Sequence, residues 1–470
     1  MSLNSKKIAK LKKKYTKWPP KNGLLINRSL VLNYLPASIS IWILRHFLIG
    51  SEYKLKRESY KFFALSNSAY SVGKVRQCKR CIRIALSLLD SNFPNSYAFL
   101  LLQSIVSTHE NSESRKSISR KIIAATKQLE ITILDATSWY QLSRGLFCLG
   151  YFRAAWVARE NSLDLSIAEV SKSSFSATVV TRAIEAQLER RNLDYVRELL
   201  VQNTVLGVKT LRSFHESLRW FEGKPANDSE VHVTIKEYSG HLFRELVERK
   251  KVALVGPGNA HYEYGVEIDS ADAVARIKYP GAEYLLDEKL FGKRCDISQY
   301  PSLEPLRELA NLSSYEYFDD LRLIVAGGTD SRPVRNIPVF CEDQELPMYR
   351  TTATSGLRLL ISILRQCPSS LKIFGYDFYS EREPYNVGMK SFYENNAWRM
   401  GIGFLFGTKE EYQRVDITSS FGAHDPVSNF CFAQNLYKAG LFEIEPYGKS
   451  ILELTPYQYV ERLEEMLGDW

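Results

Sequence analysis

Apolar residues recur at helical spacing from about residue 59 to residue 220, where glycine and proline are sparse. Within the stretch 139–155, Trp139 and Leu142 lie on one stripe of a helix, and Gly150 follows as a turn. This layout predicts two antiparallel helices, a helical hairpin of the kind found in tetratricopeptide-type repeats.

Two further stretches repeat the helical pattern more loosely. Ser173–Leu200 has Asn192 at its expected turn, and Tyr60–Asn95 has Gly73. Because no fixed repeat length emerges, the prediction is an all-α helical-hairpin domain over residues 59–222. Binding of a protein partner, self-association and covering of a neighbouring domain are all compatible with such a domain.

The pattern changes after Gly223–Ser229 (GKPANDS), a run of turn formers. Short apolar runs typical of buried strands then alternate with helical patterns. The expected strands are Lys251–Val255, Ala273–Ile277, Leu321–Val325, Leu371–Phe374 and a last one from Phe442; the expected helices are Ser355–Leu364 and Asn429–Ala439. This alternation predicts a Rossmann-like α/β domain over residues 230–470, with a largely parallel sheet covered on both faces.

The formal net charge of +9 comes from the N-terminal segment, residues 1–58. Residues 1–60 hold ten Lys and three Arg against two Glu, and eight of the lysines lie within Lys6–Lys21. Such a basic segment suits peripheral contact with anionic lipid, or it is a solvated tail. Nucleic acid is not predicted as a partner, because no basic face interleaved with aromatic residues follows.

The semi-apolar stretch Ser29–Gly50 has sixteen uncharged residues before its first charge, and it contains Asn33 and Pro36. A membrane-spanning helix needs about twenty apolar residues, and no cleavable signal peptide is evident. The seven cysteines are scattered, and the pair Cys78 and Cys81 has no second metal-ligating pair nearby, so reduced thiols are expected. These features predict a cytoplasmic protein, with peripheral contact at the inner face of the cytoplasmic membrane.

Polar side chains follow the strand Leu371–Phe374, in the sequence LKIFGYDFYSEREPY. Open α/β sheets bind ligands at the carboxyl ends of their strands, so Asp377, Tyr379 and Tyr385 are candidate site residues. Phenols are neutral hydrogen-bond donors at pH 7 and can stabilise a departing phosphate. Asp377 lies directly at the strand end, where it suits fixing the loop better than touching substrate.

A glycine-rich turn follows the first expected strand, with Gly256, Gly258 and Asn259. Backbone amides of such a turn can approach a phosphate or ribose, although an ordinary tight turn has the same appearance. The dinucleotide fingerprint fails because its third glycine is replaced by His261. A nicotinamide-dependent enzyme is therefore disfavoured, and Asp269 is only a weak candidate for a ribose contact.

Two more segments carry candidate chemistry. Thr354, Ser355 and Gly356 open a helix, where they can cap it and also bind an anion. His424 lies in a turn before the last expected helix of the α/β domain, and a loop histidine there can serve as a general base or be a hydrogen-bonded bystander.

Five segments occur in the order of a known family: Gly256–Asn259, Arg276 with Lys278, Thr354–Gly356, Gly375–Tyr379 with Tyr385, and His424. On these residues the C-terminal half, about 250–450, resembles the bacterial CMP-sialic acid-dependent sialyltransferases of glycosyltransferase family 42. It is more distantly similar to the animal sialyltransferases. The helical N-terminal half lies outside the resemblance.

The resemblance implies a GT-A-variant fold and an inverting transferase that uses a CMP-activated acidic sugar, without a metal or other cofactor. His424 would take the proton from the acceptor hydroxyl, while Tyr379 and Tyr385 would hydrogen-bond the leaving phosphate. The implied donor-binding set is Gly256, Gly258, Asn259, Arg276, Lys278, Thr354, Ser355, Gly356 and Asp377. The expected acceptor is a surface glycan or glycolipid, such as capsule or lipopolysaccharide.

This chain departs from the family pattern at two positions. Pro257 and Lys278 stand where the family has asparagines. A cation at Lys278 can meet a carboxylate or phosphate directly, so Kdo (3-deoxy-manno-octulosonate) is as serious a candidate as sialic acid. The absence of any D-x-D in 230–470 does not favour a metal-bridged nucleotide diphosphate. The alternative function is a catalytically degenerate sialyltransferase-like binding or scaffold protein.

Overall fold

The computed structural model describes residues 115–128, 131, 134–170, 176–202, 205–224, 238–279, 281, 287–300, 303, 321–327, 331–334, 336–342, 346–381, 421 and 424–467. The basic segment 1–58, the expected hairpin Tyr60–Asn95 with Cys78 and Cys81, and Tyr385 lie outside the described residues. No helix in the described part of the chain is long and apolar enough to cross a membrane.

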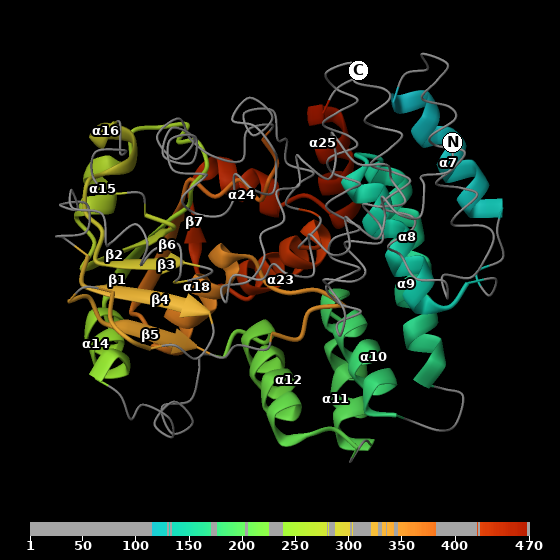
Figure 1. Ribbon diagram of the computed structural model, residues 1–470, viewed down its shortest axis with the longest axis horizontal. Helices are drawn as coiled ribbons and strands as arrows, with labels where there is room; N and C mark the ends of the chain where they lie inside the picture. Colours follow the sequence, from blue (N-terminus) through green and yellow to red (C-terminus); the bar gives the residue numbers. More distant parts are fainter. Residues whose placement is uncertain are drawn as a thin grey trace, which may run out of the picture.

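In the described part of the chain, seven strands form one sheet in which every pairing is parallel. Their order across the sheet is β5-β4-β3-β2-β1-β6-β7 (Figure 1). The strands are β1 Lys251–Val255, β2 Ala273–Ile277, β3 Ile297–Tyr300, β4 Leu323–Gly327, β5 Val339–Glu342, β6 Ser370–Phe374 and β7 Glu443–Ile444. The predicted α/β class with a largely parallel sheet is therefore confirmed.

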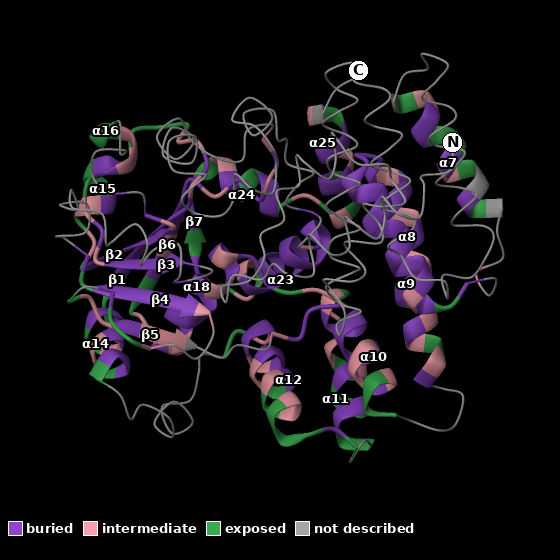
Figure 2. Ribbon diagram, in the orientation of Figure 1, coloured by how far each residue is buried: buried purple, intermediate pink, exposed green. Residues whose placement is uncertain are grey.

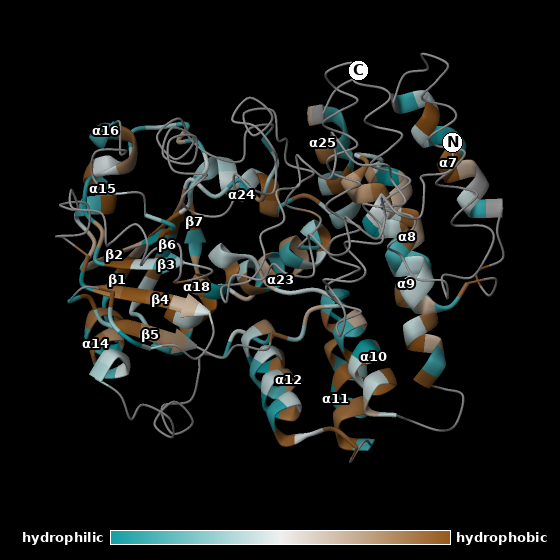
Figure 3. Ribbon diagram, in the orientation of Figure 1, coloured by the Kyte–Doolittle hydropathy of each residue, from teal (hydrophilic) through white to brown (hydrophobic). Residues whose placement is uncertain are grey.

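Both faces of the central strands are buried, which explains the apolar runs of β1 and β4 (Figures 2 and 3). Alternate residues of β1 face opposite sides: Ala253 and Val255 cluster with Ile268, while Val252 and Leu254 join the large core. The helices that accompany the strands are α14 Tyr238–Val247, α15 Gly265–Asp269, α16 Glu288–Phe291, α18 Ser355–Arg365, α23 Pro426–Lys438, α24 Pro446–Leu452 and α25 Pro456–Leu467.

The helical half contains α7 Arg115–Gln128, α8 Ala136–Cys148, α9 Phe152–Val170, α10 Ala177–Glu189, α11 Leu193–Gln202 and α12 Val208–Phe221. The predicted hairpin at 139–155 is confirmed, with Gly150 between α8 and α9 at a φ of 80°, a left-handed conformation that favours glycine. The second predicted turn, at Asn192, lies between α10 and α11.

The helical half and the sheet share one hydrophobic core. A single cluster of buried side chains runs from Trp139 of α8 to Leu254 of β1. Helix α23 is in contact with α10 and α12, and α25 with α9, so the C-terminal helices lie between the two halves (Figure 1). This arrangement places helices from residues 136–189 next to loops at the carboxyl edge of the sheet.

Candidate functional site

The sheet changes direction of winding between β1 and β6, because β2 to β5 extend to one side of β1 and β6 and β7 to the other. Loops that leave the carboxyl ends of two such neighbouring strands border the usual ligand crevice of an open α/β sheet. Here they are the glycine-rich turn Gly256–Asn259 and the segment Gly375–Glu381. The two stretches that the sequence analysis singled out thus lie side by side.

The glycine-rich turn packs directly on the loop after β6. Gly256 N donates to Phe374 O at 2.7 Å, and Gly258 N donates to Gly375 O at 3.0 Å. A Cβ on Gly256 would lie 2.2 Å from Gly375 O, and one on Gly258 would lie 2.9 Å from the same oxygen. Both glycines are therefore required for contact between the loops, and their N–H groups bond protein rather than facing a ligand.

Thr354, Ser355 and Gly356 begin helix α18 as the sequence predicts. The Thr354 hydroxyl caps the helix by accepting from Leu357 N at 3.4 Å. The Thr354 backbone N donates to Asn429 Oδ1 at 2.8 Å, which ties this loop to the first turn of α23. The start of α18 is consequently fixed by an element that lies more than seventy residues later in the chain.

Tyr376 contacts the start of α18 from the loop after β6. Its hydroxyl shares a 3.3 Å hydrogen bond with Thr354 Oγ1, and a Cβ on Gly356 would come within 2.3 Å of its ring. Burial raises the pKa of Tyr376 to about 12, so the phenol is neutral at physiological pH.

A pocket brings three of the predicted segments together. Its lining includes Thr354 and Gly356 at the start of α18, Tyr376 and Tyr379 after β6, and Pro426 and Asn429 at the start of α23. The rest of the lining is mostly apolar, from the strands and from α18, α23 and α25. The enclosed volume is about 20 Å³, enough for about one water molecule, so the pocket marks where the three segments meet and does not itself hold a nucleotide sugar.

The backbone after β6 has an unusual conformation. Phe378 and Tyr379 both have positive φ, 51° and 63°, which non-glycine residues rarely adopt. Asp377 Oδ1 accepts from Tyr379 N at 3.1 Å, and Phe378 O accepts from the hydroxyl of Tyr459 at 2.5 Å. The ring of Tyr379 packs edge-on against Phe421 at 5.9 Å. These contacts hold Tyr379 at the pocket.

Asp377 is buried and carries a perturbed carboxyl group. Burial first, and the neighbouring Glu381 second, raise the pKa of Asp377 to about 7. Its Oδ2 atom is buried and has no hydrogen-bond partner among the described residues. Asp377 therefore fixes the loop through one oxygen, as its place in the sequence suggests, and leaves the other for a proton or a ligand group.

His424 is half-buried, two residues before α23 begins. Its Nδ1 lies 3.1 Å from Thr352 O, and because a carbonyl only accepts, Nδ1 carries the hydrogen and Nε2 carries the lone pair. Burial, and then the positive charges of Arg144, Lys278 and Arg358, lower the pKa of His424 to about 4. The ring is thus neutral near pH 7, in the tautomer that a general base at Nε2 requires.

Three cations from different parts of the chain surround His424. Arg144 belongs to α8, Lys278 follows β2, and Arg358 belongs to α18. Lys278 has a φ of 53° and its backbone N donates to Gln299 O at 2.9 Å, which places this residue at the carboxyl edge. An anion bound at this edge would find a positive electrostatic environment.

Arg276 is placed elsewhere. It lies on the face of β2 opposite Ile277, and its guanidinium donates to Arg294 O at 2.8 Å and to Phe291 O at 2.7 Å. Burial lowers the pKa of Arg276. The side chain thus caps the end of α16 on the far side of the sheet, and the fold does not bring it to the pocket with the other candidates.

Asn259 and His261 meet Glu381 at the rim of the crevice. Asn259 Nδ2 donates to Glu381 Oε2 at 2.6 Å, and His261 Nε2 lies 2.7 Å from Glu381 Oε1. Both carboxylate oxygens therefore already have partners. No group of three or more His, Cys, Asp or Glu in the described ranges is placed to hold a metal ion.

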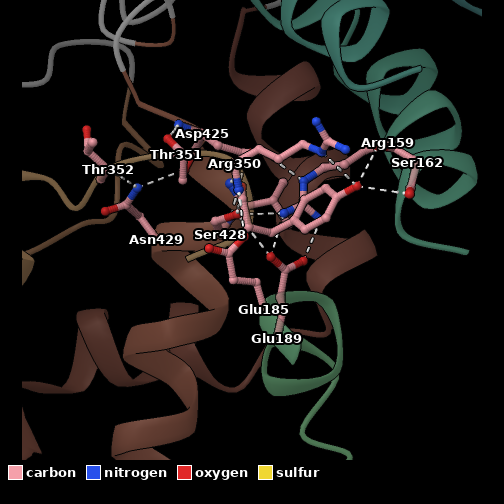
Figure 4. Close-up of polar contacts among 12 residues, drawn as sticks. Arg159, Ser162, Glu185, Glu189, Arg350, Thr351, Thr352, Asp425, Ser428 and Asn429 are labelled. Carbon is pink, nitrogen blue, oxygen red and sulfur yellow. Dashed lines mark hydrogen bonds and ion pairs between the residues drawn. The ribbon is translucent and has the colours of Figure 1, made fainter. Parts of the chain in front are cut away.

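The residue after His424 is held by an arginine from the helical half. Arg159 of α9 is fully buried, and its Nε donates to Asp425 Oδ2 at 2.9 Å. The same guanidinium forms an ion pair with Glu189 and donates to Ser428 Oγ at 2.6 Å (Figure 4). This cluster joins α9 and α10 to the start of α23.

Sequence reasoning missed Tyr376, Asn429 and Arg159. Tyr376 directly follows Gly375, but only its neighbours Asp377 and Tyr379 are predicted site residues in this loop. Asn429 was expected to begin the last helix, but α23 begins at Pro426, so Asn429 lies in the first turn and faces the Thr354 loop. Arg159 carries no local signal, because Glu189 is 30 residues away and its partners in α23 are more than 250 residues away.

Comparisons of this chain with models of protein families, with curated proteins and with solved structures find no match. What the site can do chemically follows from its own residues.

Proposed function

We propose that this protein is an inverting glycosyltransferase that moves sialic acid, Kdo or a related acidic sugar from its CMP-activated donor to a hydroxyl of a surface glycan. One observation carries the proposal. One pocket joins the start of α18, Tyr379 and the start of α23, and His424, two residues before Pro426 of that lining, has Nδ1 bonded to Thr352 O and Nε2 as acceptor. These are three of the five segments on which the resemblance to family 42 rests.

In the proposed reaction His424 Nε2 accepts the proton of the acceptor hydroxyl. The oxygen forms a bond to the anomeric carbon of the sugar while the bond from that carbon to the phosphate oxygen breaks, and the electron pair leaves with CMP. The phenol of Tyr379 donates a hydrogen bond to the departing phosphate. Tyr385, outside the described residues, has the same proposed role. CMP is a phosphate monoester, so neutral donors suffice where a diphosphate would favour a metal.

The proposed donor site uses the start of α18 and the cations near it. Backbone N–H groups at a helix N-terminus favour an anion, which suits the phosphate or the sugar carboxylate next to Ser355 and Gly356. Lys278 supplies positive charge from the end of β2. Asp377, whose pKa burial raises to about 7, holds the loop after β6 that carries Tyr379 at this site. Arg276 is left out of this site because its guanidinium is committed to α16.

A second candidate function is a degenerate transferase fold that serves as a binding scaffold. The observation that favours it is the glycine-rich turn, whose Gly256 and Gly258 N–H groups bond the loop after β6 instead of facing the crevice. Pro257, which stands where family 42 has an asparagine, also favours the scaffold function. A scaffold of this kind need not bind CMP, so calorimetry with CMP separates the two functions.

The proposed setting is the inner face of the cytoplasmic membrane, where capsule or lipopolysaccharide precursors are built. The lysine-rich segment 1–58 would contact anionic lipid there. Binding of the full chain to vesicles with and without anionic lipid, compared with a chain whose eight early lysines are replaced by glutamine, tests this part.

The decisive experiment is release of CMP from CMP-N-acetylneuraminate and from CMP-Kdo by the purified protein. His424→Ala is expected to reduce the rate at least about 100-fold, the typical contribution of a general base. His215→Ala, an exposed histidine on α12, is the matched control and is expected to leave the rate unchanged. The proposal fails if wild type neither binds nor consumes either donor.

A further inference from the structure

Arg159 is a buried cation whose partners all belong to one small region. Its side chain is 0% exposed and faces two carboxylates, Asp425 and Glu189, together with the hydroxyl of Ser428. Burial opposes the charge of Arg159, but the two carboxylates outweigh it and hold the arginine pKa above its usual value. Each guanidinium nitrogen therefore has a hydrogen-bond partner, which helps a buried charge to be tolerated.

Asp425 links Arg159 to the start of α23 and to the loop that contains Thr351. Its Oδ2 accepts from Arg159, while its Oδ1 accepts from Val427 N at 2.9 Å and Ser428 N at 3.2 Å, which starts helix α23. Its backbone N donates to Thr351 Oγ1 at 2.9 Å. Every polar group of Asp425 is thus used to fix the chain at His424, the preceding residue.

The loop on the other side of His424 is anchored to the same helices. His424 Nδ1 donates to Thr352 O, and two residues earlier Arg350 Nη1 donates to Thr137 Oγ1 of α8 at 2.9 Å. The hydroxyl of Tyr349 lies 2.6 Å from Ser162 Oγ of α9. Figure 4 shows Arg159, Ser162 and Glu189 of the helical half lying next to Arg350, Asp425 and Ser428 of the two segments on either side.

We propose that the helical half is a structural part of the catalytic centre, and that Arg159 is a positioning residue that orients His424 through Asp425. The effect of Arg159 on catalysis rests on the proposed function. The orientation of His424 by Arg159 is independent of that function.

Other ion pairs besides those of Arg159 also join the helical half to the α/β half. Arg153, six residues earlier on the same helix, pairs with Glu464 of α25 at 3.1 Å, and Arg365 pairs with Glu216 of α12 at 2.6 Å. Neither pair contains a residue next to His424. Replacing a buried ion pair by apolar side chains is often neutral for stability, so the cluster at Arg159 suits fixing one arrangement rather than adding stability.

The test compares Arg159→Met with Arg153→Met, a matched loss of one interface arginine from the same helix. Arg159→Met is expected to lower kcat for the CMP-sugar about 100-fold, as a displacement of roughly 1 Å does, with KM within about threefold. Arg153→Met is expected to retain wild-type kcat. Arg159→Lys should restore part of the rate, because an ammonium can still reach Asp425 but not all three partners.

A second readout follows His424 directly and needs no turnover. Nitrogen-15 NMR of histidine-labelled full-length protein, with the His424 signals assigned by their loss in His424→Gln, reports which ring nitrogen carries the hydrogen. Wild type and Arg153→Met should show the Nδ1–H tautomer, and Arg159→Met a mixture of both. If Arg159→Met does not fold, Ser428→Ala replaces it in this measurement. Ser428→Ala removes one hydrogen-bond partner of Arg159 and keeps its ion pairs with the two carboxylates. It should shift the His424 signals less than Arg159→Met would.

Equal kcat in Arg159→Met and Arg153→Met, or an unchanged His424 tautomer in Arg159→Met or its substitute, would overturn the inference. If wild type turns over neither CMP-sugar, the proposed function fails, and the tautomer measurement still decides whether Arg159 positions His424.

Discussion

Gly356 lies so close to Tyr376 that a Cβ at this glycine would come within 2.3 Å of Cε2 of the phenol ring. The ring can lie against the start of α18 only because this side chain is absent. Ile277 Cδ1 on β2 would be 2.8 Å from the same Cβ, so there is no space on the other side. The three residues form a packed unit between β2, α18 and the loop after β6.

Gly356→Ala is therefore expected to push Tyr376 out of the pocket wall. Overpacking of this kind lowers the free energy of unfolding by about 1–3 kcal/mol, and affinity for CMP should fall with it. Denaturant unfolding and calorimetry measure the two effects. The double variant Gly356→Ala, Tyr376→Leu should recover part of the stability, because the smaller side chain leaves room; simple additivity of the two losses would contradict the packing explanation.

The two glycines of the turn after β1 should respond unequally to alanine. Gly256→Ala places a methyl group 2.2 Å from Gly375 O, a backbone atom that moves only with its loop, whereas the distance at Gly258 is 2.9 Å. We expect losses of roughly 2–4 kcal/mol for Gly256→Ala and about 1 kcal/mol for Gly258→Ala in urea unfolding. The reverse order, or loss of CMP binding without loss of stability, would assign the turn to ligand instead of to the β6 loop.

The pKa of His424 should rise when an anionic nucleotide binds. In the free protein burial and three cations lower this pKa to about 4, and a bound phosphate or carboxylate offsets the cations. NMR titration of the ring with and without CMP measures the shift, and uncharged cytidine is the control. Since the base must be neutral, the rate should fall on the acid side of the pKa in the complex, so the acid limb of kcat should lie at higher pH than that of kcat/KM.

The same histidine makes stability depend on pH. Its folded pKa of about 4 lies below the ordinary value of 6.5, so between these values the unfolded chain binds the proton and the folded one does not. Stability contributed by His424 is present above pH 6.5 and is lost as pH falls toward 4. His424→Gln should flatten this part of the curve of unfolding free energy against pH, and His215→Gln on the surface should not.

Asp377 should make the free energy of unfolding depend on pH in the opposite direction to His424. Its folded pKa of about 7 lies above the usual 3.8, so the folded state holds a proton that the unfolded state has lost, and stability falls as pH rises from about 4 to 7. Asp377→Asn mimics the neutral carboxyl and should stabilise the protein at pH 8 by at most about 4 kcal/mol. Glu263→Gln, on the surface, controls for loss of a carboxylate; a destabilising Asp377→Asn at pH 8 would show that the anion is needed there.

Local sequence patterns were sufficient for much of the sheet. Strands β1 and β2 have the predicted bounds, because each is rich in apolar residues and is followed by a turn. Strands β3 and β5 were missed. In β3 the buried positions include Ser298 and Gln299, so the strand does not look apolar, and Ser298 Oγ is used to accept from Tyr279 N. Its burial is a tertiary property that no local pattern contains.

The start of α23 was predicted three residues late although a local signal exists. Asp425 followed by Pro426 is a typical cap and first residue of a helix. For the site, the pattern located His424, Thr354 and Tyr379 on segments that do meet. Their orientation could not be predicted, because it depends on the contacts of Arg159 with Asp425 and of Asn429 with Thr354, whose residues are far apart in sequence.

The contact between Arg159 and Asp425 also bears on how the chain acquires its structure during synthesis. The two residues are separated by 266 positions, which a ribosome translates in about 13–53 s. Until then helix α9 carries a guanidinium with none of its α23 partners, Asp425 and Ser428, available. The helical half is made first, but Arg159 acquires these partners only after α23 has emerged, so this buried cluster forms later than helix α9 itself can.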